Sequence, residues 1–351
     1  MPDDAAQSPP AGRRSEHGAR DAVSRAQHST YIEAIREALI EEMEQDRRVF
    51  LLGEDIAAYG GAFKLTAGFL DRFGADRVID TPIAEAGIIG AAIGAALMGM
   101  RPIVEIQFLD FISCGFDQLT NFAAKAHYRY GAPIPIVIRG PGGGGVGGGP
   151  FHSQSVEMYF VKTPGIKVVA PATATDAKIL LKAAIRDPNP VLFIEHKALY
   201  RAPGLREPLP GPDVIGELGV AATRREGDDL AIITYGAMLH RTLEAADILA
   251  RDGIECRVVD LRTLAPLDDA ALIDATRACG KILIVHEDTR TGGLAGEITS
   301  RIHEGAFEWL DGPITRVTAP DAPIPFNKTL EAAFFPQIED IVTAARRLAA
   351  Y

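Results

Sequence analysis

A single carboxylate, Glu85, stands at the start of the longest uncharged run in the sequence. The run, from Ala86 to Met100, is rich in alanine and glycine and gives way to IVEIQF, which is typical of a strand. Its uniformly apolar composition predicts a fully buried helix. An acid at the N-terminal end of such a helix either caps it, because negative charge is favourable there, or takes part in chemistry. Spacing alone favours the cap.

His152 is a second candidate for chemistry, because it follows directly on the glycine-rich loop GPGGGGVGGGP at 140–150. A lone histidine is more often a surface or hydrogen-bonded residue than a catalyst. Three of the glycines formally match GxGxxG, but a dinucleotide site also needs them to open directly into a helix. Pro150 and Phe151 separate them from the next helical pattern. The loop therefore indicates either a mobile connection or a close approach of backbone or ligand.

These candidates lie in a chain whose strand and helix patterns alternate. Residues 29–205 show apolar strands such as VFLLG and PIPIVIR between helical patterns, and residues 220–351 alternate more regularly still. Such alternation predicts an α/β fold of two domains, with mostly parallel sheets covered by helices. The segment at 206–219, in a stretch rich in proline and glycine, is expected to link the domains. Residues 1–28 hold few large apolar side chains and are expected to form a disordered tail.

Composition and charge exclude several classes of protein. The formal net charge of −11 argues against a nucleic-acid binder, which would show a basic patch. The uncharged run is too short for a membrane span, which takes about 20 residues. The three cysteines are far apart and lack a CxxC, which indicates a reducing compartment and no zinc site or disulfide framework. The start shows no signal peptide, and its acidic residues favour a bacterial cytoplasmic location over the mitochondrial matrix.

Many stretches together resemble one family. They are GED, DTPIAE, EIQF, NFAAKAHYRY, HSQS, PGIKVVAP, DAKILLKAAIRDPNPVLFIEHKALYR, DLRTLAPLD and HEDTRTGG. These resemble the β subunit of the thiamine-diphosphate-dependent 2-oxoacid dehydrogenases, the first component of the pyruvate and branched-chain 2-oxoacid dehydrogenase complexes. The resemblance covers about residues 29–345. It implies a transketolase-like pyrimidine-binding domain at 29–205 and a smaller transketolase-like C-terminal α/β domain at 220–351.

The resemblance also implies roles for single residues. Glu85 matches the carboxyl group that hydrogen-bonds the aminopyrimidine ring nitrogen of thiamine diphosphate and so activates the cofactor. A buried carboxyl with a raised pKa can share a proton in this way. Phe111 matches the aromatic residue that packs on the pyrimidine, and Gln107 lies beside it. His152 matches the family's active-site histidine, which would transfer protons and orient groups near the substrate and the lipoyl group.

A monovalent cation, usually potassium, is a further implication of the resemblance. In similar β chains it binds main-chain and side-chain oxygens near the positions of Ile136, Ala184, Asp187 and Asn189. Read from the residues alone, Asp187 and Asn189 are most simply turn residues. The glycine run at 142–149 is longer than the family pattern leads us to expect.

One motif of the family is missing from this chain. Related enzymes hold the diphosphate through magnesium with a GDG motif and a later asparagine, and the nearest string here, Gly227-Asp228-Asp229, leads straight into a strand. In the family that motif belongs to the α subunit. The resemblance therefore implies half an active site, magnesium bound mainly by the α subunit, and a heterotetramer of two α and two β chains.

The expected activity is that of an oxidoreductase that decarboxylates a small 2-oxoacid and passes the acyl group to the lipoyl arm of a dihydrolipoyl acyltransferase. The C-terminal domain is expected to dock that acyltransferase, and both pyruvate and branched-chain acids fit as substrates. Alternatives are half of a transketolase-like enzyme of the deoxyxylulose-phosphate synthase kind, a non-catalytic assembly subunit, and a nucleotide-binding protein. HSQS and AIRDPNP fit the first less well, the presence of both Glu85 and His152 argues against the second, and only the glycine loop supports the third.

Overall fold

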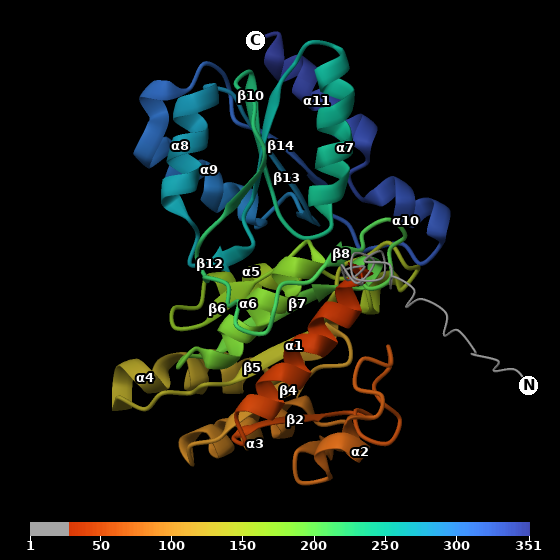
Figure 1. Cartoon of the computed structure of the whole chain (residues 1–351). Coiled ribbons are helices and arrows are strands. Elements are labelled where there is room, and N and C mark those ends of the chain that lie inside the picture. The colour runs from red at the N-terminus through yellow and green to blue at the C-terminus, as the bar shows by residue number, and fades with distance from the viewer. Residues whose placement is uncertain (1–27) are drawn as a thin grey trace, which may run out of the picture.

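The computed structural model describes residues 28–351, which form two α/β domains stacked one above the other (Figure 1). Each domain is built on its own sheet, one of seven strands and one of five. The expected α/β class, with a mostly parallel sheet in the first domain, is confirmed. The expected disordered tail lies outside the described residues, apart from its last residue, His28.

The first domain is organised around a parallel sheet. Its strands are β2 (Val49–Gly53), β3 (Val78–Asp80), β4 (Arg101–Glu105), β5 (Val137–Gly142), β6 (Lys167–Val169), β7 (Val191–His196) and β12 (Thr263–Ala265). They lie in the order β12-β6-β7-β5-β4-β2-β3, and all neighbours are parallel except β12, which pairs antiparallel with β6. Parallel strands buried on both faces show as continuous apolar runs, which is why VFLLG was recognisable.

Helices cover both faces of this sheet. They are α1 (Tyr31–Gln45), α2 (Phe69–Phe73), α3 (Glu85–Leu97), η2 (Leu109–Gly115), η3 (Gln118–Ala123), α4 (Ala124–Tyr130), η4 (Gly149–Phe151), α5 (Glu157–Val161), α6 (Ala174–Arg186) and η5 (Lys197–Leu199). α1 and α6 share one core with the sheet, while α3, η2, η3 and α4 lie in the core on the other face. Lys178 of α6 pairs with Glu37 and Glu41 of α1, which fastens the two helices together.

The second domain repeats this layered plan with fewer strands. Its strands are β9 (Ala222–Arg225), β10 (Leu230–Thr234), β11 (Cys256–Asp260), β13 (Ile282–Thr289) and β14 (Thr315–Ala319), and its helices are α7 (Met238–Arg251), α8 (Asp269–Cys279), α9 (Leu294–Ala306), η6 (Phe307–Trp309), α10 (Lys328–Phe334) and α11 (Ile338–Ala349). The order is β14-β13-β10-β11-β9, with only β9 antiparallel. α7 and α11 cover one face. The face with α8 and α9 shares a continuous core with the first domain.

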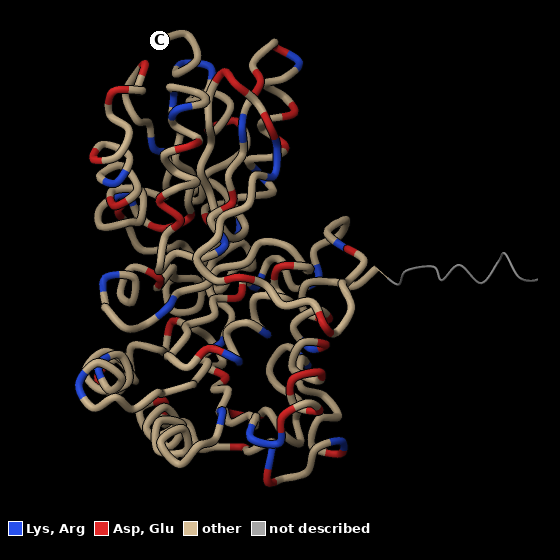
Figure 2. Tube along the Cα trace, turned by 60° about the vertical axis from the view of Figure 1, so that its left-hand side comes forward, with Lys and Arg blue, Asp and Glu red and all other residues tan. Residues whose placement is uncertain are grey.

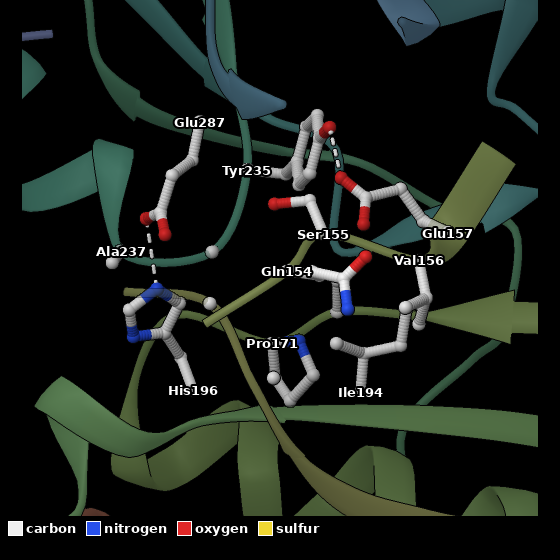
Figure 3. A pocket seen from close by; sticks show the side chains of 14 residues that line it. Gln154, Ser155, Val156, Glu157, Pro171, Ile194, His196, Tyr235, Ala237 and Glu287 are labelled. Carbon is white, nitrogen blue, oxygen red and sulfur yellow. Dashed lines mark hydrogen bonds and ion pairs between the residues drawn. The ribbon is translucent and has the colours of Figure 1, made fainter. Parts of the chain in front are cut away.

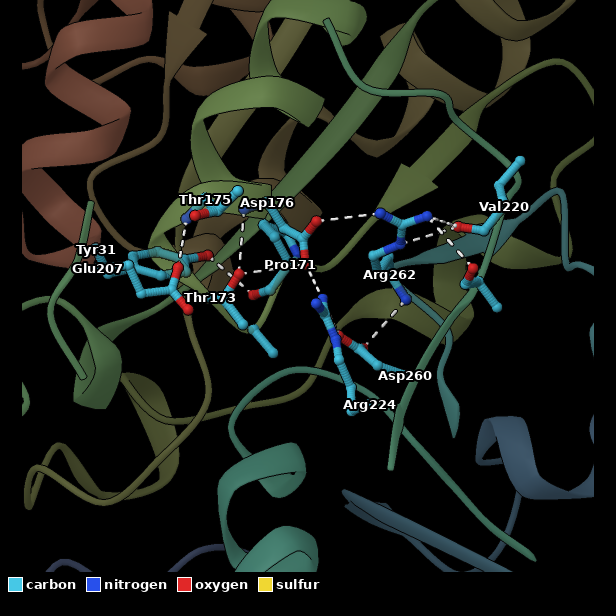
Figure 4. Close-up of polar contacts among 12 residues, drawn as sticks. Tyr31, Pro171, Thr173, Thr175, Asp176, Glu207, Val220, Arg224, Asp260 and Arg262 are labelled. Carbon is cyan, nitrogen blue, oxygen red and sulfur yellow. Dashed lines mark hydrogen bonds and ion pairs between the residues drawn. The ribbon is translucent and has the colours of Figure 1, made fainter. Parts of the chain in front are cut away.

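Polar contacts reinforce this junction. Asp176 of α6 pairs with Arg224 of β9 and with Arg262, which lies between β11 and β12 (Figure 4). Arg224 also binds Asp260 at 2.9 Å. The segment between the domains adds a further contact, since β8 (Glu207–Pro208) pairs antiparallel with β1 (His28–Ser29). Strand pairing therefore holds the linker to the first domain, while ion pairs and a shared apolar core join the two domains.

The helix α3 differs from its expected full burial. Ile88, Ile89, Ala92, Ile93 and Ala96 are buried, but the opposite side, formed by Gly87, Gly90, Ala91, Gly94 and Leu97, is exposed. Acidic and basic residues are interspersed over both domains (Figure 2), whereas α3 carries a single charge, at Glu85. An apolar composition cannot distinguish burial within one chain from burial against a second chain, and only one side of α3 is buried within this chain. No helix within residues 28–351 is long and apolar enough to cross a membrane.

Candidate active site

The first sheet brings the predicted site residues to one edge. Because β3, β4 and β5 run parallel, their carboxyl ends lie at the same edge, the usual ligand site of open α/β sheets. Glu85 follows β3, Gln107 and Phe111 follow β4, and His152 follows β5. The candidate active site is therefore the carboxyl edge of this sheet.

Glu85 is half-buried as the first residue of α3. The N-cap residue is Ala84 and no side chain hydrogen-bonds the helix end, but Glu85 lies in the first turn, where a negative charge is favourable, so its position also fits the simpler role at the helix end. Within the part of the chain that the structure describes, the Glu85 carboxylate accepts no hydrogen bond. Glu54 lies near it, and its pKa is raised first by burial and then by the charges of Glu85 and Asp55. Glu85 is thus a carboxylate free to bind a ligand.

His152 packs between two aromatic rings. Its ring centroid lies 4.7 Å from that of Phe108 and 5.5 Å from that of Phe111, both in edge-on contacts. Among residues 28–351, the His152 imidazole has no hydrogen-bond partner. Its position is therefore fixed by ring packing and by its own backbone, and both nitrogens are available for proton transfer.

The turn η2 lies near both Glu85 and His152. Phe111, in the middle of this turn, contacts His152, whereas Gly115 at its end lies against α3. A Cβ added to Gly115 would come within 3.5 Å of the Glu85 carbonyl oxygen and within 2.3 Å of Ile89. Gln107 lies half-buried between β4 and η2. Phe111 and His152 are therefore in contact, and the backbone of Glu85 lies near the other end of the same turn.

A buried ion cluster that the sequence analysis missed supports this edge. Arg139 of β5 pairs with Glu105 of β4 and with Glu195 of β7, and Tyr200 donates a hydrogen bond to Glu195. Arg139 is 1% exposed and Glu195 is fully buried. Burial opposes the charge of Arg139, but the two glutamates hold its pKa well above the ordinary value. Opposite charges inside neighbouring apolar strands were the signal that could have revealed the cluster.

A cavity lies between the domains, beside this edge. It has a volume of about 30 Å³ and is lined by residues of β5, β7 and the loop after His152, and by Tyr235 and Glu287 of the second domain (Figure 3). His196 binds Glu287 across the cavity at 2.8 Å, and Tyr235 donates a 2.7 Å hydrogen bond to Glu157. Both contacts join the first domain to the second, so the cavity lies among polar contacts of the domain junction.

The titration of Glu157 at this junction makes the free energy of unfolding depend on pH. Burial, and then the charge of Asp288, raise the pKa of Glu157 from 4.5 to about 8. The folded chain therefore keeps a proton that the unfolded chain releases above pH 4.5, so the free energy of unfolding falls as the pH rises toward 8, by up to about 1.4 kcal/mol per pH unit. Glu157→Gln should flatten this slope in urea unfolding of the β chain between about pH 5 and pH 8. Equal slopes in the two proteins would contradict the assignment.

The four residues of the expected cation site lie together, at the opposite edge of the sheet. Ile136 precedes β5, and Ala184, Asp187 and Asn189 precede β7. The carbonyls of Ile136 and Ala184 each already accept a backbone N–H, from Val191 and from Asp187. The Asp187 carboxylate pairs with Lys167 and accepts a 2.8 Å hydrogen bond from the Asn189 amide. The proximity of these oxygens fits a cation, while their present partners also fit the simpler role of a turn.

Comparisons with known proteins agree with this architecture. Residues 27–203 match the family described as transketolase, pyrimidine binding domain, and residues 219–341 match transketolase, C-terminal domain. The chain is 49% identical to the 2-oxoisovalerate dehydrogenase subunit beta of Bacillus subtilis (strain 168) over 325 residues, which cover 92% of this chain and 99% of the relative. It is 44% identical to the pyruvate dehydrogenase E1 component subunit beta of the same bacterium over 321 residues, or 91% and 98% of the two chains.

A solved structure shows the same fold. The split gene transketolase, an inactive beta4 tetramer, superimposes with a TM-score of 0.76 at 22% identity and covers 92% of this chain and 99% of its own. Fold and paired domains thus define a transketolase-type protein. The identity to two dehydrogenase subunits over nearly the whole chain is more specific: the chain belongs to the family of 2-oxoacid dehydrogenase β subunits. The expected family is confirmed, while the domain boundaries and the roles of single residues stay predictions.

Proposed function

We propose that this protein is the β subunit of a thiamine-diphosphate-dependent 2-oxoacid dehydrogenase. The enzyme decarboxylates a small 2-oxoacid and passes the acyl group to the lipoyl group of a dihydrolipoyl acyltransferase. The observation that carries the proposal is the 49% identity with a 2-oxoisovalerate dehydrogenase β subunit over almost the whole chain. The unpartnered carboxylate of Glu85 at the carboxyl edge of the sheet supports it independently.

The residues at this edge fit the pyrimidine end of thiamine diphosphate. The free carboxylate of Glu85 can hydrogen-bond a ring nitrogen, and Phe111, which is 37% exposed on the turn that packs against α3, offers an apolar ring face. Gln107 would add a polar contact at the end of β4. When bound, the cofactor supplies the carbon nucleophile that attacks the 2-oxo group and allows carbon dioxide to leave. Glu85 would hold a proton at the pyrimidine nitrogen through this hydrogen bond.

His152 would act later, at the step that involves the lipoyl group. Its imidazole is half-buried, lies against Phe111, and has both nitrogens free of partners within residues 28–351. It can therefore give or take a proton near a substrate that binds beside the pyrimidine. Its edge-on contacts with two rings would keep the imidazole oriented toward that substrate.

A partner chain would complete the site. The sequence lacks the GDG motif that holds magnesium and diphosphate, and the exposed side of α3 is apolar. Large apolar residues are also exposed on and around this helix and on the neighbouring η2–α4 segment: Ile83, Leu97, Met98, Phe116, Phe122 and Tyr128. Extensive apolar exposure of this kind marks protein interfaces. We place the α subunit and the second β subunit of a heterotetramer of two α and two β chains on these surfaces.

Other components follow from the same proposal. Magnesium would be bound mainly by the α subunit, and potassium would occupy the oxygens around Ile136, Ala184, Asp187 and Asn189. The C-terminal domain would dock the acyltransferase. The bacterial relatives support a place in the bacterial cytoplasm for the whole assembly.

The proposal is tested by coexpressing the chain with an α subunit that carries a GDG motif and a following asparagine. The purified complex should decarboxylate pyruvate or 2-oxoisovalerate only with thiamine diphosphate and magnesium, and the preferred acid would name the complex. A complex that assembles but decarboxylates neither acid would instead support a non-catalytic assembly subunit. Transfer of a ketol group between sugar phosphates would support the transketolase-like alternative.

His152→Ala separates the two half-reactions of this complex. Because His152 acts near the lipoyl group, the variant should lose about a hundredfold or more in acylation of a free lipoyl domain. Decarboxylation measured with an artificial electron acceptor and the affinity for thiamine diphosphate should change much less. His303→Ala, at an exposed histidine of α9, is the matched control. Equal losses in lipoyl acylation and cofactor binding would count against the assigned role.

A further inference from the structure

Two carboxylates of the second domain hold the glycine-rich loop. The backbone amides of Gly145 and Gly147 donate to the two oxygens of Glu331, at 3.1 Å and 2.7 Å. The amide of Gly144 donates to Glu287. Glu331 belongs to α10, which lies at the junction of the two domains (Figure 1), and is 3% exposed. The loop is thus fixed by charge-assisted hydrogen bonds across the domain junction.

The glycines allow this close approach. A Cβ on Gly143 would lie 2.1 Å from the His196 ring, and a Cβ on Gly144 would lie 2.1 Å from Phe335. Gly143 also has φ at +72°, where side chains are strained. Of the two interpretations that the sequence left open, the structure shows the close approach. The length of the glycine run follows from the need to pass several residues closely against the second domain.

The same loop supports the backbone of His152. A Cβ on Gly148 would lie 2.7 Å from the His152 carbonyl oxygen, and the His152 amide donates to the carbonyl of Gly149 at 3.3 Å. On the other side of His152, the Gln154 amide donates to Asp110 at 2.9 Å. Since the imidazole has no hydrogen-bond partner within residues 28–351, its position depends on packing against Phe108 and Phe111 and on the backbone that the loop and its anchors support.

A buried cation balances these carboxylates. Lys197 is 5% exposed, and its Nζ has no hydrogen-bond partner in the described part of the chain. The acidic groups that face it are Asp110, Glu287 and Glu331. Burial lowers the pKa of Lys197 to about 8, and these three acids oppose that shift. Lys197 and these three acids therefore form one electrostatic group, which extends from Glu331 in α10 to Asp110 in η2.

We infer that Glu331 is a positioning residue for His152: by holding the amides of Gly145 and Gly147, it fixes the loop that places the imidazole for the lipoyl step. The assignment deepens the proposed function and rests on it for the role of His152. The contact itself, between α10 and the loop, does not depend on any activity. The two oxygens of Glu331 are bound to backbone amides of the loop, so the loop is its direct link to His152.

Amide hydrogen exchange of the assembled complex tests the contact without any catalytic assay. In Glu331→Ala, peptides covering residues 142–152 should exchange about tenfold faster, the effect expected for losing interactions of about one hydrogen bond. Glu331→Gln keeps one acceptor oxygen and should fall between this variant and the wild type. Glu339→Gln, at an exposed glutamate of α11, is the control for loss of charge and should leave these peptides unchanged. Unchanged exchange in Glu331→Ala would overturn the inference.

A double-mutant cycle tests the route through His152. Glu331→Ala should reduce acylation of a lipoyl domain about tenfold to a hundredfold, the range expected for a displaced catalytic group. Glu331→Gln should recover part of this loss, and thiamine diphosphate affinity should stay close to that of the wild type. In a His152→Ala background the same substitution should have little further effect, because the residue it positions is absent.

The outcomes separate this inference from the proposed function. Equal losses from Glu331→Ala with and without His152 would show that Glu331 does not act through His152, which overturns the inference. If His152→Ala leaves lipoyl acylation intact while Glu331→Ala still speeds exchange of the loop, the role of His152 fails and the contact stands. Should Glu331→Ala fail to assemble, the isosteric Glu331→Gln supports the same cycle.

Discussion

Glu85→Gln should reduce 2-oxoacid turnover by at least about a hundredfold, the scale of a lost general acid or base. The amide has nearly the shape of the carboxyl but cannot hold or release a proton at the pyrimidine nitrogen. Assembly with the α subunit should be retained, because the Glu85 carboxylate has no hydrogen-bond partner within residues 28–351. The measurement is steady-state decarboxylation by the purified complex, with assembly followed by light scattering.

A second glutamate provides the comparison for this result. Glu308→Gln removes an exposed carboxyl of η6 and should leave turnover unchanged. If Glu85→Gln retained wild-type turnover in an assembled complex, the cofactor-activating role would be wrong. A loss confined to assembly would instead indicate that Glu85 belongs to the subunit interface alone.

Arg139→Met should lower the free energy of unfolding by about 3–5 kcal/mol, as expected when one partner of a buried ion pair is removed. The substitution leaves Glu105 and Glu195 buried side by side without their cation, and Glu195 is fully buried. Burial already raises the pKa of Glu105, and loss of the Arg139 charge would favour its protonated form further. Urea unfolding of the isolated β chain at neutral pH gives the value.

An exposed ion pair provides the matched control. Arg346 pairs with Asp252 between α11 and the end of α7, with side chains 53% and 40% exposed. Arg346→Met should change the free energy of unfolding by less than about 1 kcal/mol, because water screens such pairs. If Arg139→Met had an equally small effect, the buried cluster would not be what holds β4, β5 and β7 in place.

Much of the fold was predictable because its strands are buried on both faces. VFLLG is a continuous apolar run and IVEIQF is a mostly apolar one, and their alternation with helical patterns predicts a parallel sheet. The shared edge of Glu85 and His152 follows from the parallel order of β3, β4 and β5, which the structure supplied. The expected burial of α3 is met within this chain on one side only, since its apolar residues divide between the chain's own core and an exposed side. Composition alone cannot separate these two kinds of burial.

The supports of the site were not predictable from local patterns. Glu331 lies in a short helix of the second domain, and the sequence around it shows no motif that points to the glycine loop. Its role depends on two domains meeting, which hydrophobic periodicity does not reveal. The ion cluster around Arg139 was nearer to prediction, since its charges stand inside apolar strands. Which of these charges pair with each other could be known only from the strand order, which places β5 between β4 and β7.

The strand β12 makes the first sheet depend on the second half of the chain. It covers the edge of β6 and comes after β11, so a fragment that ends before residue 263 leaves β6 with unpaired amides and carbonyls. An exposed edge of this kind invites pairing with other molecules. The apolar core that runs through both domains would also be cut open. Expression of the first domain by itself should therefore yield aggregating material, and the intact β chain should unfold as a single cooperative unit.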